Sequence, residues 1–151
     1  MKTINTEKAL QAYSLLNAAK YNKMDDTEKI AVFKITRAIK PIATTFEDAS
    51  KDAIEKMKFE GFEEQLAKAK EYERKKKEGS EDTPITDDEY KAFIIKLVEY
   101  DKLAKEAIKQ LGDKEETIDV ELLSEDSFAK LMSSNDWTME QAIVVSEVVC
   151  K

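Results

Sequence analysis

Two stripes of hydrophobic residues dominate the pattern of this chain. The first advances in steps of three and four residues and comprises Val32, Ile35, Ile39, Ile42, Phe46, Ala49 and Ala53. The second repeats the same steps and comprises Tyr90, Phe93, Leu97, Tyr100, Ala104, Ala107 and Leu111. This spacing places each set on one side of an α-helix, with charged residues on the other sides. We therefore predict two long helices that pack against each other as an antiparallel hairpin.

Polar residues mark the ends of the predicted helices. Three pairs have the spacing of a capping box: Asp25 with Glu28, Thr86 with Glu89, and Thr138 with Gln141. Ser124 is expected to cap a short helix near the C-terminus, and Gly112 is expected to follow the second long helix as its C′ residue. A short amphipathic helix is predicted from Thr6 to Tyr21, ahead of the first long helix.

A proline lies inside the first stripe. Pro41 removes one backbone hydrogen bond and crowds the preceding turn, which kinks or breaks a helix. Because the stripe keeps its phase from Ile39 to Ile42, we predict a kink at this point and not a break. The segment Gly79–Pro84 contains glycine, serine and proline, and it predicts the loop between the two long helices.

One segment alternates strictly between hydrophobic and acidic residues, with Ile118, Val120 and Leu122 separated by Asp119 and Glu121. This pattern predicts a strand from Thr117 to Leu123. A lone strand needs partners for its backbone groups. The alternatives are the N-terminal residues Lys2–Asn5, a second copy of the chain, and the sheet edge of another protein. A fourth alternative is an extended segment that forms no strand.

The predicted fold class is mainly α: an antiparallel long-helix hairpin with a short N-terminal helix and a small C-terminal strand plus helices. The chain length suits a single domain spanning residues 1–151. Its expected parts are helices in 6–78, a linker in 79–85, the partner helix in 86–112, and an acidic strand with a helical tail in 113–151. The basic run Arg74–Lys77 is flanked by acids, and we interpret it as a solvated helix end.

Composition and charge narrow the classes of partner. Charged residues make up 38% of the chain, which has only three glycines and two prolines, and such a chain has too few turns for a sandwich or barrel. The net charge is -7, and residues 112–150 contain ten acidic and only two basic residues. An acidic segment repels phosphate, so we expect a basic protein surface as partner and no direct contact with nucleic acid.

The residues that usually carry out catalysis are scarce. The chain has no histidine, which is the commonest general base and metal ligand, and its one cysteine, Cys150, therefore lacks an activating partner. Three glycines provide neither a P-loop nor a dinucleotide fingerprint. We expect no catalytic, metal or cofactor-binding residues and no membrane span. The single cysteine and the lack of a secretory segment predict a soluble protein of the cell interior, or one packaged into a particle assembled there.

The segment Arg37–Met57, RAIKPIATTFEDASKDAIEKM, contains Ile39-Lys40-Pro41 followed by Phe46-Glu47-Asp48-Ala49. With residues 4–62 and 117–149, it resembles a family of small tailed-phage proteins of unknown function. In that family a Lys-Pro-containing helix precedes a charged middle region, an acidic alternating strand and a short helical tail. The resemblance implies no catalytic residues. It implies a phage setting, either in the virion or in the host cytoplasm, and a role in assembly or in handling host factors.

We therefore expect a non-enzymatic interaction protein that is a phage virion or assembly component and binds phage structural proteins or further copies of itself. The alternative is an acidic phage inhibitor of a host protein that binds nucleic acid or acts in defence. A third possibility is an enzyme that uses carboxylates alone. The expected interaction residues are Ile118, Val120, Leu122, Asp119, Glu121, Glu125, Asp126 and Trp137.

Overall fold

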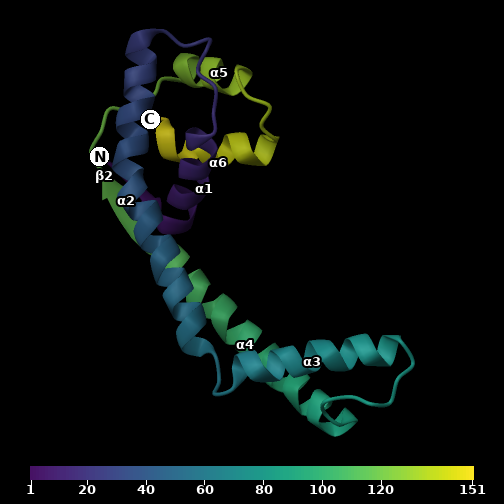
Figure 1. Ribbon diagram of the computed structural model, residues 1–151. Helices are drawn as coiled ribbons and strands as arrows, with labels where there is room; N and C mark the ends of the chain where they lie inside the picture. The colour runs from purple at the N-terminus through teal and green to yellow at the C-terminus, as the bar shows by residue number, and fades with distance from the viewer. The chain divides into compact units, whose positions relative to one another are not determined.

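The computed structural model describes all 151 residues, of which 70% are helical. Its helices are α1 (Thr6–Asn17), α2 (Asp26–Met57), α3 (Phe62–Lys77), α4 (Asp87–Gly112), α5 (Glu125–Ser133) and α6 (Met139–Val149), and its strands are β1 (Lys2–Asn5) and β2 (Glu115–Ile118) (Figure 1). The prediction of a mainly α protein with two long helices is confirmed.

The chain divides into two compact units, which is a finer division than the single domain expected from its length. Unit 1 comprises residues 1–51 and 109–151, and unit 2 comprises residues 52–108. The helices α2 and α4 each contribute residues to both units, whereas α3 belongs to unit 2 alone.

Unit 1 contains the main hydrophobic core. Side chains of α1, α2, α5, α6 and both strands form one buried cluster, which comprises Ile4, Ala9, Ala12, Leu16, Met24, Val32, Ile35, Ile39, Ile118, Leu123, Leu131, Val145, Val148 and Val149. The first half of the α2 stripe, from Val32 to Ile39, therefore packs among these elements. We had expected α4 to cover that half, but no residue of α4 belongs to the cluster.

The helices α2 and α4 do pack together, but farther along α2 than the two stripes suggested. In unit 1, a Cβ placed on Gly112 would lie 3.5 Å from Phe46 Cε2. In unit 2, the Tyr100 hydroxyl donates a hydrogen bond to the Ile54 carbonyl at 3.5 Å. The predicted antiparallel hairpin is confirmed, but its pairing is shifted because the N-terminal elements and the C-terminal helices already bury the beginning of the α2 stripe.

The local signals in the sequence locate the starts of the helices well. In the capping box at the start of α2, the Glu28 amide donates to Asp25 Oδ1 at 2.8 Å and the Asp25 amide donates to Glu28 Oε1 at 3.1 Å. The boxes at Thr86 and Thr138 are also present, and Ser124 caps α5. The helix α2 continues through Pro41 without a break.

Two predicted helix ends differ from the structure. The first helix ends at Asn17 and not at Tyr21, whose hydroxyl instead donates a hydrogen bond to the Leu16 carbonyl. Gly112 is the last residue of α4, and its φ is not positive, so it is not a left-handed C′ residue. A Cβ at Gly112 would lie 3.1 Å from Glu7 Cβ, which indicates that close packing against α1 favours glycine there.

The strand pairs within the chain. The strand β2 is antiparallel to β1, with Lys2 opposite Ile118 and Asn5 opposite Glu115. The N-terminal residues Lys2–Asn5 are thus the partner, which was the first of our alternatives. The predicted range Thr117–Leu123 was wrong, because β2 spans Glu115–Ile118 and only Leu123 forms a further bridge, to Cys150.

Unit 2 is built on aromatic contacts and ion pairs. Gly61 adopts a left-handed conformation with φ 77° and separates α2 from α3, so the run predicted through residue 78 is two helices. Phe62 contacts Phe59 and Tyr100 with ring centroids 5.1 and 4.8 Å apart, and Tyr72 stacks on Tyr90 at 4.3 Å.

The basic run at the end of α3 is tied to acidic neighbours. Arg74 pairs with Glu71 and Glu78, Lys75 with Asp82, and Lys76 with Asp87. These contacts are those of a solvated helix end, as the sequence suggested.

Candidate protein-interaction surface

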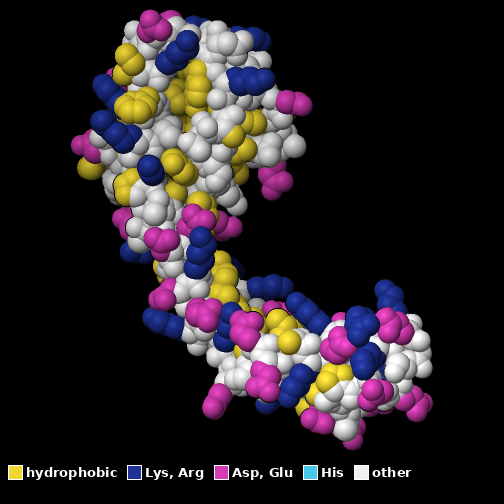
Figure 2. Space-filling model, in the orientation of Figure 1, with side chains coloured by type: hydrophobic (Ala, Val, Ile, Leu, Met, Phe, Trp, Pro, Cys, Tyr) yellow, Lys and Arg dark blue, Asp and Glu magenta, His cyan; other side chains and the backbone are white.

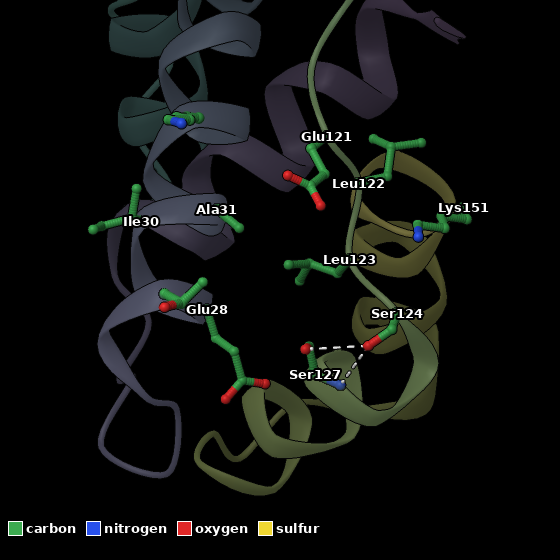
Figure 3. A pocket seen from close by; sticks show the side chains of 11 residues that line it. Glu28, Ile30, Ala31, Glu121, Leu122, Leu123, Ser124, Ser127 and Lys151 are labelled. Carbon is green, nitrogen blue, oxygen red and sulfur yellow. Dashed lines mark hydrogen bonds between the residues drawn. The ribbon is translucent and has the colours of Figure 1, made fainter.

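A groove of about 290 Å³ lies in unit 1 between the start of α2 and the irregular segment that follows β2. On the α2 side it is lined by Thr27, Glu28, Ile30, Ala31 and Lys34, and on the other side by Glu121, Leu122, Leu123, Ser124, Ser127 and Lys151. In Figure 3, Ala31 and Leu123 point toward each other across it. The lining of the groove combines apolar side chains with polar and charged ones, as is typical of a site that binds another molecule.

The wall of the groove formed by this segment contains unpaired backbone groups. Leu123 donates its N–H to the Val149 carbonyl at 2.7 Å and accepts from the Lys151 N–H at 3.3 Å. Val120, Glu121 and Leu122 make no backbone-to-backbone hydrogen bond. Unpaired backbone groups of this kind are available for main-chain hydrogen bonds to a bound segment.

An ion pair holds one margin of the groove in place. Lys130 Nζ of α5 lies 2.8 Å from Glu28 Oε1 of α2. The hydrogen bond from Lys130 is the main reason why the pKa of Glu28 is lowered to about 2. Ser124 Oγ accepts a hydrogen bond from the Ser127 amide at 3.2 Å, as the dashed lines in Figure 3 show. The carboxylate of Glu28 is therefore ionised and paired with Lys130.

Next to the groove, α2 presents an exposed surface that is both hydrophobic and basic, and we call it the outer face of α2. It comprises Lys29, Ile30, Phe33, Lys34, Arg37 and Lys40. Ile30 is 54% exposed and Phe33 is 61% exposed, although large hydrophobic side chains are usually buried. Figure 2 shows basic side chains beside hydrophobic ones over this part of α2.

The charges on the outer face of α2 are not neutralised within the chain. None of its four basic residues takes part in any of the ion pairs of the structure, and no acidic residue occurs between Lys29 and Phe46. The Arg37 guanidinium lies 5.5 Å from the Phe33 ring centroid, a cation–π contact that holds both side chains on the surface. This surface was missed by our sequence reasoning, which followed the hydrophobic stripe and overlooked the acid-free basic stretch beside it.

The four acidic residues that we expected to make contacts are at the surface. Asp119, Glu121, Glu125 and Asp126 are all exposed, and none forms an ion pair. Glu121 lines the groove beside α2, whereas Glu125 and Asp126 line a separate depression of about 920 Å³ that also contains Lys2 and Cys150.

The four expected hydrophobic contacts are less accessible. Ile118 is only 4% exposed and belongs to the core of unit 1. Val120, Leu122 and Trp137 are half-buried and pack against that core. The structure therefore brings Glu121 and Leu122 together at the groove, uses Ile118 for stability, and does not place Trp137 among the residues that line the groove.

Three further features were considered for this chain: a reactive thiol, a metal site and a membrane span. Burial raises the pKa of the Cys150 thiol, so its thiolate form is disfavoured. No three acidic or cysteine side chains are grouped in a way that could hold a metal ion. None of the helices combines the length and the hydrophobicity that crossing a membrane requires.

The fold defines a mainly α protein with two packed long helices and a two-stranded antiparallel sheet. Comparison of the chain with protein-family models, with curated proteins and with solved structures gives no match.

Proposed function

We propose that this chain is a non-enzymatic interaction protein that binds another protein through the outer face of α2 and the adjoining groove. The observation that carries this proposal is the exposure of Ile30 and Phe33 beside unpaired basic side chains. Exposed hydrophobic residues that are rimmed by polar groups are typical of surfaces that bind other proteins.

The chemistry of the surface indicates the kind of partner. Lys29, Lys34, Arg37 and Lys40 would pair with acidic side chains, and Ile30 and Phe33 would take up hydrophobic ones. The unpaired backbone groups at Val120–Leu122 favour a partner segment that can form main-chain hydrogen bonds in the groove. Nucleic acid suits the groove less well, because the lining has no excess of positive charge: Lys34 and Lys151 are matched by Glu28 and Glu121.

The biological setting rests on the resemblance to small tailed-phage proteins. In that setting the proposed role is that of a virion or assembly component, and the partner is an acidic segment of a phage structural protein. This partner differs from the basic protein that the overall charge suggested, because the outer face of α2 is locally positive in an acidic chain.

Site-specific photo-crosslinking tests the proposal. A photo-reactive benzoylphenylalanine replaces Phe33 in the full chain, expressed in the cells that naturally produce it, and cross-linked products are identified by mass spectrometry. We expect one dominant partner protein, and we expect Lys34→Glu combined with Arg37→Glu to abolish the product. The same probe at Ile143, which is 50% exposed on α6, serves as a matched control. Identical products from both positions would contradict the proposal.

A second test compares two matched pairs of surface substitutions. Ile30→Asp with Phe33→Asp should weaken binding to the identified partner by about a hundredfold or more, because charges would replace two hydrophobic side chains that the partner covers in the complex. Met139→Asp with Ile143→Asp alters a similar pair of exposed residues on α6 and should leave binding unchanged. Equal effects of the two pairs would contradict a role for the outer face of α2.

The second candidate function is inhibition of a basic host protein by the acidic residues of unit 1. It is supported by the exposure of Asp119, Glu121, Glu125 and Asp126 without ion pairs. Changing these four residues to Asn or Gln should abolish binding to such a protein, and high salt should weaken it. The two functions are distinguishable by changing Asp119, Glu125 and Asp126 alone, because these three residues, unlike Glu121, do not line the groove.

A further inference from the structure

The helix α4 has a second stripe of regularly spaced residues on the side away from its neighbours. Asp88, Lys91, Ile95, Val98 and Lys102 follow one another in steps of three and four. The residues of α4 that are buried in unit 2, Phe93 and Ala104, lie on the opposite side of the helix. Ile95 is 70% exposed and Val98 is 63% exposed, although both are branched hydrophobic residues. The second stripe is therefore unpartnered within the chain.

The charged residues of this stripe are also unpaired. Unit 2 contains many ion pairs, including those of Lys68, Arg74, Lys75 and Lys76 on α3. By contrast, no charged side chain from Asp88 to Lys109 takes part in an ion pair. A surface that has exposed hydrophobic residues at its centre and free charges of both signs around them resembles one half of a helix–helix interface.

The order of these charges is complementary to itself when the helix is reversed. If two copies of α4 run antiparallel with Ile95 facing Ile95, then Asp88 faces Lys102 of the other copy and Lys91 faces Glu99. In the same register Ala92 faces Val98. Moving the helices by three residues, so that Ile95 faces Val98, places Lys91 opposite Lys102 and brings like charges together. One antiparallel register is therefore favoured over its neighbour.

We propose that two copies of the chain associate through the outer stripe of α4 as a symmetric antiparallel pair centred on Ile95. The occupant of this surface is a second copy because the charge pattern is its own complement, and an isologous interface requires that property. The inference is independent of the proposed function, since it concerns unit 2 and not the outer face of α2.

Sedimentation equilibrium of the full chain is the first test. We expect a concentration-dependent dimer, and we expect Ile95→Glu to raise the dimer Kd by about a hundredfold, because it removes two apolar contacts and brings two carboxylates together. Leu103→Glu is the matched control, since Leu103 is exposed on α4 outside the stripe, and it should leave the Kd unchanged. A wild-type chain that stays monomeric, or a dimer that Ile95→Glu does not weaken, would overturn the proposal.

A charge exchange tests the register. Asp88→Lys and Lys102→Asp should each weaken the dimer, because each places like charges opposite one another. The double variant exchanges the two charges and should recover most of the wild-type affinity. Circular dichroism of each variant checks that the helices are retained. A double variant that dimerises no better than the single variants would overturn the antiparallel register.

Disulfide trapping gives a direct readout of the symmetry axis. In a Cys150→Ser background, Ile95→Cys should form an intermolecular disulfide under mild oxidation, because the two cysteines would face each other. Leu103→Cys in the same background should form little, since position 103 lies outside the stripe. Equal cross-linking of the two variants would contradict an interface centred on Ile95.

Discussion

The interactions that stabilise the interior of unit 1 differ from those within unit 2. Of the 21 hydrophobic residues that are buried, 17 lie in unit 1 and only Phe62, Ala69, Phe93 and Ala104 lie in unit 2. Of the 12 ion pairs, eight lie in unit 2 and four in unit 1. Exposed ion pairs each contribute little to stability, whereas buried hydrophobic side chains contribute much more. Unit 1 should therefore be the more stable of the two.

The two surfaces that we propose for binding also differ in the packing of the unit that carries them. The outer face of α2 in unit 1 is mounted on a well-packed core, which suits a preformed binding site. The outer stripe of α4 lies in a unit with few buried contacts, where association with a second copy would add apolar burial. Binding to the folded state stabilises the part of a protein that binds. We therefore expect dimerisation to stabilise unit 2 more than unit 1.

The largest expected effect is the loss of a core side chain in unit 1. Ile39 is completely buried, and Ile39→Ala should lower the free energy of unfolding by about 4 kcal/mol, because it removes buried methyl groups and leaves a cavity. Urea unfolding followed by circular dichroism measures this loss. Ile143→Ala is the matched control, because Ile143 is 50% exposed and lies outside both proposed surfaces, and its effect should stay within about 1 kcal/mol. Similar losses for both variants would contradict the assignment of the core.

The next largest effect should be confined to unit 2. Phe62 joins the aromatic contacts of that unit, and Phe62→Ala should lower its local stability by about 3 kcal/mol. Native-state hydrogen exchange should then show lost protection of amides in α3 and in the first half of α4, with α1 and α6 unchanged. An equal loss of protection in α1 and α6 would show that the two units unfold as one, and the contrast between them would fail.

A smaller effect is expected at the turn that follows α3. Gly79 has φ 77°, and a Cβ there would meet no other atom within 4 Å. Gly79→Ala should therefore cost about 1 kcal/mol from backbone strain alone, without any steric clash. Gly79→Asn should cost less, since asparagine tolerates the left-handed region better than alanine does. Thermal unfolding of both variants measures the difference, and an equal Tm for Gly79→Ala and wild type would contradict it.

The smallest effect concerns pH. The pKa of Glu28 is lowered to about 2 in the folded state, so its ion pair with Lys130 stabilises the fold above the ordinary glutamate pKa of 4.5. That contribution should be lost as the pH falls from 4.5 toward 2. Glu28→Gln should remove this part of the acid sensitivity and leave the rest. Carboxyl NMR titration of Glu28 gives the pKa directly, and a value near 4.5 would contradict the prediction.

Much of the secondary structure could be read from local patterns. The boxes at Asp25, Thr86 and Thr138 locate the starts of three helices because capping depends on residues three positions apart. The stripe on α4 identified its buried side correctly, since Phe93 and Ala104 are buried. The strand was predicted too far along the chain, because the alternation at Ile118–Leu122 continues into a segment that has no strand partner.

The candidate site was only partly accessible to sequence reasoning. Glu121 and Leu122 were predicted from the sequence as interaction residues, and both line the groove. Ile30, Phe33 and Arg37 of the outer face of α2 were not predicted. Periodicity alone cannot show that Ile30 and Phe33 are exposed, because hydrophobic residues outside a stripe are often covered by another element. The acid-free stretch from Lys29 to Phe46 was the available signal.

The sequence by itself determined the helical class of this protein, most of its helix starts and the passage of α2 through Pro41, because these follow from contacts between residues that are close along the chain. Only the tertiary structure decided that β1 and β2 pair, that Val32–Ile39 pack with the terminal elements, and that two compact units form. These features join residues that are far apart in the sequence. Several partners could bury the same hydrophobic stripe, and the choice among them depends on the packing of the whole chain.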